Sequence, residues 1–122
     1  MPVIVSSKSR YVGSVSPSSL NSETIVVDIP SQSDDYIVEG YIDLNALASG
    51  DQVIVREYIA LDGTNYRTFA TVTYSGPVSD PIVRFHTKTI PNNAMYRVTI
   101  TQTSGTLRTF NYGFILEVLS SM

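Results

Sequence analysis

The sequence predicts an all-β protein, a two-sheet antiparallel sandwich of about seven or eight strands with a jelly-roll or immunoglobulin-like arrangement. From Glu23 onward, apolar and polar residues alternate with a period close to two, which is the spacing of side chains along one face of a strand. Clusters of Gly, Pro, Asn, Asp and Ser interrupt this alternation at short intervals. Helical periodicity never lasts beyond one turn, which argues against an α/β nucleotide-binding fold.

The first part of the chain has a different pattern. After Pro2, residues 3–5 ("VIV") predict a short edge strand, because proline cannot donate a hydrogen bond to a neighbouring strand. Residues 6–23 are rich in serine, and we expect an extended arm or long loop with a further strand near residues 11–15. An ordinary surface loop and an arm that reaches a neighbouring subunit are both compatible with this composition.

The strands of the sandwich follow in order, each bounded by turn residues. The alternating segments are 23–29, 36–44, 52–60, 66–74, 82–89, 95–103 and 107–119. Residues 45–49 predict one short helical turn, since Leu44 and Leu47 are three positions apart. The dipeptide Asp62-Gly63 tolerates the positive φ angles of a tight turn, so the segments that flank it predict a β-hairpin.

Two of these segments show which face meets the core. In the second segment, the face predicted to be buried carries Tyr36, Val38, Gly40, Ile42 and Leu44. The last segment has one uninterrupted apolar face, which predicts a strand in the centre of a sheet: Phe110, Tyr112, Phe114, Leu116 and Val118. The end of this segment is also apolar on its other face, at Ile115 and Leu119. Either another part of the chain or another chain is expected to cover that second face.

The composition is that of one folded domain. The chain has 122 residues, of which 43% are hydrophobic and 16% charged, so it can bury a core of its own. We divide it into an N-terminal arm or long loop, residues 1–22, and a sandwich domain, residues 23–122.

The charge pattern and the missing residue types exclude several classes of function. The formal net charge is −3 and the eight Lys and Arg are scattered, whereas nucleic-acid binding needs concentrated positive charge, so nucleic acid is not expected as the main partner. No apolar run reaches the roughly 18 residues of a membrane-spanning helix. The start "MPVIVSSKSRYVG" lacks the pattern of a secretory signal. Without cysteine there is no disulfide, thiolate nucleophile or zinc finger.

Residues that carry chemistry are sparse and do not form a recognisable catalytic set. The single histidine, His86, lies in the middle of a predicted strand without a partner motif, and no serine occurs in G-x-S-x-G. The turn carboxylates are Asp34, Asp35, Asp51, Asp62 and Asp80. We therefore expect no enzyme activity, no catalytic residue, no cofactor and no metal site, with a calcium site at one end of the sandwich as a remaining hypothesis.

Tyrosine and arginine supply the candidate contact residues. The chain has eight Tyr and no Trp, and five predicted strands carry one Arg each. Both residue types are enriched at protein interfaces, although arginine stems also cover apolar surface on an ordinary solvated sheet face. The candidates are Arg10, Tyr11, Tyr41, Arg56, Tyr58, Arg67, Arg84, His86, Arg97 and Arg108.

One stretch also carries a resemblance to known proteins. In "YIDLNALASGDQVIVREYIALDG", residues 41–63, the order of strand, turn, Gly-Asp reversal, strand and hairpin resembles small β-sandwich proteins of virus particles, including capsid decoration, spike-base and tail-associated subunits. The resemblance extends over residues 36–119 and includes no diagnostic motif, so no site residue is carried over from it. It implies a jelly-roll-like structural subunit.

These features together predict a non-enzymatic structural protein of a viral particle, a capsid decoration or other virion-associated subunit. It would lie in the virion and bind copies of itself, other virion proteins, or both. The alternative is a carbohydrate-binding or adhesion module with a glycan as partner, outside or inside a cell. That alternative requires two or more coplanar, exposed tyrosines beside turn carboxylates.

Overall fold

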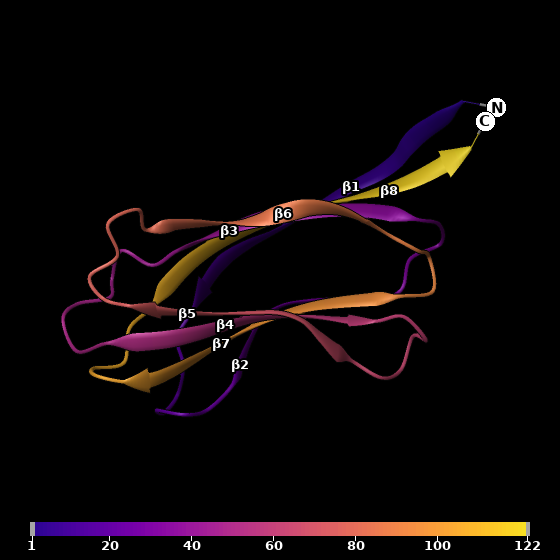
Figure 1. Cartoon of the computed structure of the whole chain (residues 1–122). Helices are drawn as coiled ribbons and strands as arrows, with labels where there is room; N and C mark the ends of the chain where they lie inside the picture. Colours follow the sequence, from indigo (N-terminus) through magenta and orange to yellow (C-terminus); the bar gives the residue numbers. More distant parts are fainter. Residues whose placement is uncertain (1, 122) are drawn as a thin grey trace.

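A computed structural model describes residues 2–121, which form eight strands in two four-stranded antiparallel sheets that face each other (Figure 1). In the first sheet, called the β3–β8 sheet, the order is β1 (Val3–Val15), β8 (Phe110–Ser121), β3 (Tyr36–Asp43) and β6 (Ile82–Ile90). In the second, the β4–β7 sheet, the order is β2 (Thr24–Ile29), β7 (Met95–Ser104), β4 (Gln52–Ala60) and β5 (Arg67–Ser75). No helix occurs within residues 2–121, and the predicted all-β sandwich is confirmed.

The connections make this sandwich a jelly roll rather than an immunoglobulin fold. Every pair of consecutive strands lies in different sheets, with β4 and β5 as the one exception among the described strands. This crossing back and forth places the last two strands, β7 and β8, inside their sheets. It is the arrangement of an eight-stranded double-sheet jelly roll.

The β4–β5 pair is the hairpin that the sequence predicts. Gly63 has a φ of 76°, and its N–H donates to the carbonyl of Ala60 over 3.1 Å. The Asp62 carboxylate accepts hydrogen bonds from the N–H groups of Thr64 and Asn65 over 2.9 and 2.7 Å. The bonds from Asn65, followed by that from Thr64, lower the pKa of Asp62 to about 2. The turn is therefore fixed by its own side chain.

The segment at residues 45–49 forms a turn and not a helix. The N–H of Leu47 donates to the carbonyl of Leu44 over 3.1 Å, which closes one hydrogen-bonded turn. The chain reverses again at Gly50, whose φ is 92°. The expected helical turn is thus a single reverse turn between β3 and β4.

The core lies between the two sheets and is built from the alternation that the sequence shows. The predicted buried face of β3 is confirmed, with Tyr36, Val38 and Ile42 fully buried. The Tyr36 hydroxyl donates to the carbonyl of Ala94 over 2.8 Å, so this aromatic side chain is buried with its polar atom satisfied. In β8, which lies between β1 and β3 as expected for a central strand, Phe114 is buried and its ring lies 5.2 Å from that of Phe85.

A polar cluster also joins the sheets between the core and the β5–β6 side. Lys88 of β6 lies 3.2 Å from Glu57 of β4, and both side chains are 13% exposed. The hydroxyl of Tyr96, on β7, donates to Glu57 over 2.5 Å. Burial, and then the carboxylate of Glu57, raises the pKa of Tyr96. Because each charged group has a partner, the cluster links β6 to the opposite sheet without leaving a buried charge unpaired.

The N-terminal segment pairs with β8 over the whole length of β1, from Val3 opposite Ser121 to Val15 opposite Phe110. The register shifts once, next to Ser6, whose hydroxyl donates to the carbonyl of Val118 over 3.1 Å. Beyond this irregularity, the paired ends of β1 and β8 project from the body of the sandwich (Figure 1).

We expect Gly40→Ala to destabilise the fold by about 2 kcal/mol or more, because overpacking a core displaces its neighbours. A Cβ at Gly40 would lie 2.2 Å from the Phe114 ring and 2.7 Å from the carbonyl oxygen of Gly113. Gly113→Ala is the control, since its Cβ would meet only Val12 at 3.8 Å, and we expect a change within about 0.5 kcal/mol. Urea unfolding of both variants measures the difference, and equal effects would contradict this packing.

Candidate interaction surface

The outer face of the β3–β8 sheet brings together four of the predicted contact residues. Arg10 lies on β1, Tyr41 on β3, and Arg84 and His86 on β6, and all four are exposed. Tyr41 is directly opposite Arg84 on one neighbouring strand and Gly113 on the other. Residues opposite each other across antiparallel strands have Cβ atoms about 5 Å apart, so these side chains form one surface.

A hollow lies at the centre of this surface, over Gly113. The glycine has no side chain, and the side chains around it are apolar and exposed: Val12 at 73%, Tyr41 at 46% and Ile115 at 38%. The depression has a volume of about 480 Å³, and Gly40 belongs to its lining. We call Val12, Tyr41, Gly113 and Ile115 the glycine hollow.

Arginine and other charged residues surround the glycine hollow. Arg10 is opposite Ile115 across the β1–β8 pair. Within residues 2–121, neither Arg10 nor Arg84 forms an ion pair. Glu39 is engaged, since the hydroxyl of Thr87 donates to it over 2.7 Å. The guanidinium groups of both arginines are thus available to acceptors of a partner.

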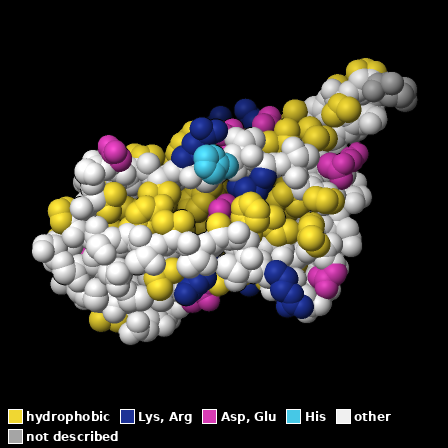
Figure 2. Space-filling model, in the orientation of Figure 1, with side chains coloured by type: hydrophobic (Ala, Val, Ile, Leu, Met, Phe, Trp, Pro, Cys, Tyr) yellow, Lys and Arg dark blue, Asp and Glu magenta, His cyan; other side chains and the backbone are white. Residues whose placement is uncertain are grey.

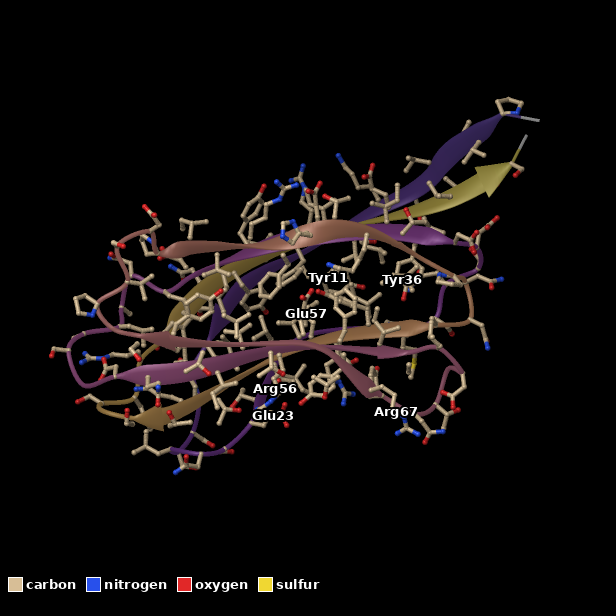
Figure 3. The ribbon with its side chains drawn as sticks, in the orientation of Figure 1. Tyr11, Glu23, Tyr36, Arg56, Glu57 and Arg67 are labelled. Carbon is tan, nitrogen blue, oxygen red and sulfur yellow. The ribbon has the colours of Figure 1, made fainter. Side chains whose placement is uncertain are left out.

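Three other predicted residues lie on the outer face of the opposite sheet, where they bind groups of their own chain. The Tyr58 hydroxyl donates to Glu23, and Arg56 lies 3.9 Å from the same carboxylate. Figure 3 shows Arg56 and Glu23 side by side below the lower layer. Burial, and then the bond to Glu23, raises the pKa of Tyr58. These two candidate side chains are occupied within the subunit.

Arg97 is occupied in the same way. Its guanidinium donates to Asp28 over 2.9 Å and lies 4.1 Å from the centre of the Tyr66 ring. The hydrogen bond with Asp28 is the main reason that the pKa of Arg97 is raised. The Tyr66 hydroxyl donates to the same aspartate over 2.9 Å. The cluster fastens the loop before β5 to the outer face of β7.

The remaining predicted residues are dispersed. Tyr11 packs against the core from β1, between the layers (Figure 3). Arg67 begins β5 and lines a separate hollow at the hairpin end, beside the exposed side chains of Leu61 and Phe69. Arg108 lies in the loop before β8 and pairs with Asp51.

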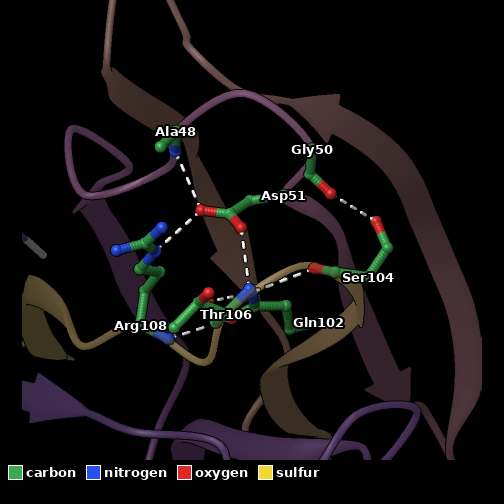
Figure 4. Close-up of polar contacts among 7 residues, drawn as sticks. All are labelled: Ala48, Gly50, Asp51, Gln102, Ser104, Thr106 and Arg108. Carbon is green, nitrogen blue, oxygen red and sulfur yellow. Dashed lines mark hydrogen bonds and ion pairs between the residues drawn. The ribbon is translucent and has the colours of Figure 1, made fainter.

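Asp51 holds three segments together at one end of the sandwich (Figure 4). Its side chain is 2% exposed, and its carboxylate accepts hydrogen bonds from the N–H groups of Ala48 and Thr106, each over 2.9 Å. The Arg108 guanidinium donates to it over 2.7 Å. The Ala48 bond, followed by the Arg108 bond, lowers the pKa of Asp51. Arg108 therefore has a partner inside the subunit, and no local sequence pattern indicates this pair.

The sites considered for other functions are not assembled in the described part of the chain. No three His, Asp or Glu side chains within residues 2–121 are grouped to hold a metal ion. Over the same residues, His86 makes no side-chain hydrogen bond, and no helix is long and apolar enough to cross a membrane. Tyr41 is the one exposed tyrosine among residues 2–121, and the rings of Tyr58 and Tyr66 meet at 81°. A flat tyrosine platform for a sugar is therefore not formed by the described tyrosines.

Sequence reasoning identified part of the glycine hollow and missed part. Tyr41 was a candidate, and the apolar second face of the last strand included Ile115, whereas Gly113 was not singled out. Val12 was missed because the N-terminal arm was not expected to pair along its whole length. The signal that locates Val12 is its alternation with Tyr11, which faces inward.

No protein-family model matches the sequence, and the comparison with curated proteins gives no match. Solved structures with a similar fold do exist. A protein of Bacillus endospore appendages, described as a novel family of disulfide-linked pili, has a TM-score of 0.57 at 14% identity, covering 97% of this chain and 89% of that one. A chain of infectious bursal disease virus, Gt strain, has a TM-score of 0.53 at 14% identity, covering 96% of this chain and 32% of that one.

The present chain thus spans about a third of the viral chain that it matches. At these identities the likeness is one of fold, and it confirms the resemblance to β-sandwich proteins of virus particles at that level. The disulfide linkage named for the pili has no counterpart here, because the chain has no cysteine.

We expect Asp51→Asn to lower the thermal midpoint at neutral pH by on the order of 5 °C and to weaken its dependence on acid pH. The folded-state pKa of Asp51 lies below the usual value, so its contribution is present above about pH 4 and is lost as the pH falls through the folded value. Thermal melts from about pH 7 to pH 3 measure this. Asp80→Asn, at an exposed turn, is the control, and identical pH profiles for the two variants would contradict the role of Asp51.

Proposed function

We propose that the protein is a non-enzymatic structural subunit of a viral particle, a capsid decoration or other virion-associated protein. It acts by surface contact with copies of itself or with other virion proteins. The observation that carries this proposal is the glycine hollow, an exposed apolar depression with free arginines at its margin. An apolar centre with arginine and tyrosine around it is the composition of a protein interface.

The position of the hollow in the fold suits this role. Its side chains project from β1, β3 and β8, which are paired strands, so their positions are fixed before a partner arrives. Binding to a preformed surface loses less conformational entropy than binding to a loop. A small rigid surface of this kind gives modest affinity in a single contact and becomes effective when many copies bind together.

The fold agrees with a structural role. The similar solved structures are named for a pilus and a virus, and neither name refers to an enzyme. Because one fold supports many functions, the support comes from the surface first and the fold second. The exposed imidazole of His86 belongs to the arginine margin of this surface in our proposal.

We expect the double substitution Tyr41→Ser with Ile115→Ser to weaken self-association or binding to the particle by at least about tenfold, because it removes the apolar walls of the hollow. Sedimentation equilibrium over a concentration series up to about 1 mM measures the association. The control is Leu20→Ser with Leu107→Ser, since these leucines are each 40% exposed and lie in loops.

The proposal fails if the unmodified protein stays monomeric over the whole series and binds no other virion protein. It also fails if both double variants associate as the unmodified protein does. Tight binding of an oligosaccharide, lost in the Tyr41 variant, would favour the carbohydrate-binding alternative instead.

A further inference from the structure

The two long sides of the sandwich differ. On one side β1 approaches β2, and the side chains of Val15, Val26 and Val27 are buried. On the other side, between β5 and β6, the interior is open to water. Figure 2 looks onto this side, where an apolar band runs between the layers below His86.

A groove on the open side reaches the edge of the core. This groove of about 250 Å³ runs between β5 and β6, and its lining includes the buried core residues Val55 and Phe85 and the half-buried Val83. Val72 points into this groove from β5 and is 46% exposed, although its partner across the β4–β5 pair is the buried Val55. Val72 thus faces the interior from an edge strand but remains in contact with water, and a further strand beside β5 would bury it.

The four edge strands differ in how well they are protected against pairing with a strand of another molecule. Charged side chains along an edge discourage another strand from pairing with it. Such side chains occur within the other three edge strands: Lys8 and Arg10 in β1, Asp28 in β2, and Arg84 and Lys88 in β6. In β5 the only charged residue is Arg67, at its first position. From Ala70 to Ser75, β5 carries no charge and keeps an unbroken register with β4.

The sequence of β5 is also complementary to itself. In an antiparallel pair of two β5 strands related by a two-fold axis at Val72, that valine faces its own copy. Thr71 then faces Thr73, and Ala70 faces Tyr74, so every opposed pair in this stretch is uncharged. Apolar and threonine pairs of this kind stabilise antiparallel strands. Arg67 and its copy lie at opposite ends of the pair.

The partner strand β6 does not favour the same arrangement in the other sheet. Its Arg84 and Lys88 place positive charge along this edge, so two copies of β6 side by side would bring like charges together. Only the β4–β7 sheet is therefore continued, from four strands in one subunit to a sheet shared by two. This symmetric contact closes on itself and adds no further subunits.

The area of such a contact indicates a weak dimer. Residues 69–75 overlap over about 24 Å, and a two-layer sandwich is roughly 20 Å thick, which gives about 1,000 Å² for both partners. Stable complexes bury about 1,200 Å² or more. A reversible contact of this strength suits an assembly in which a second surface of each subunit is also engaged.

We infer that a second copy of this chain binds at the open side, through antiparallel pairing of β5 with its own copy about a two-fold axis at Val72. The exposed Val72 pair and the groove beside it are then covered by the neighbouring subunit. This inference deepens the proposed function and rests on it for the choice of partner. It concerns the groove between β5 and β6, which shares only Arg84 and His86 with the margin of the glycine hollow.

Cysteine cross-linking tests the register directly, because the chain has no cysteine of its own. In the inferred dimer the two Cα atoms at position 72 are about 5 Å apart, a distance that a disulfide spans. We expect Val72→Cys to form a disulfide-linked dimer at least about tenfold faster than Ile25→Cys under mild oxidation. Ile25 is the matched control, as a β-branched residue of the other edge strand of the same sheet with 48% exposure.

A charge exchange provides a second test that does not depend on oxidation. Val72→Lys and Val72→Glu each place like charges opposite each other, so we expect each to weaken the dimer at least about tenfold. A one-to-one mixture of the two variants should restore a dimer that contains both chains, as measured by sedimentation equilibrium and native mass spectrometry. Thermal melts of each variant establish that it is folded.

The results separate this inference from the proposed function. Equal cross-linking at positions 72 and 25, or no recovery in the mixture, overturns the β5 pairing even if the protein assembles through the glycine hollow. Rapid cross-linking at position 72 in a protein that forms nothing beyond a dimer and binds no virion protein supports the pairing and overturns the structural-subunit proposal.

Discussion

The structure depends on the burial of one face of each sheet against the other. The two apolar faces are removed from water only together, because each sheet leaves its other face exposed. The chain meets this condition by crossing between the layers at nearly every connection. Strands distant in sequence therefore become neighbours, as β1 and β8 do along their whole length. The glycine hollow, whose side chains come from β1, β3 and β8, follows from these pairings.

The interior between the sheets is closed more completely on the β1–β2 side than on the β5–β6 side. Where β1 approaches β2, the valines close the interior, whereas between β5 and β6 a polar cluster takes their place. The pair of Lys88 and Glu57, with Tyr96, bridges the layers there and keeps them connected. A charged link holds two sheets together without filling the space between them, so the groove beside it stays open. The side that is least closed is also the side with the least protected edge strand.

Arginines that looked equivalent in the sequence have separate roles in the structure. Arg97 and Arg108 neutralise acids of their own subunit, and so contribute to the fold more than to a contact. Arg10 and Arg84 form no ion pair within residues 2–121 and border the glycine hollow. The difference lies in whether an aspartate or glutamate on a neighbouring strand or loop meets the guanidinium. Asp51 and Arg108 are 57 positions apart, and no local pattern connects them.

The sequence by itself determined the seven strands after residue 22, the hairpin at Asp62-Gly63 and the buried face of β3, because alternation and turn chemistry are properties of a few consecutive residues. It also indicated, through Ile115 and Leu119, that the second face of the last strand is apolar at its end. Only the tertiary structure decided which strands are neighbours, which side of the sandwich stays open and which arginines remain unpaired. These features arise from contacts between distant segments, whose free energies depend on how all the strands pack together.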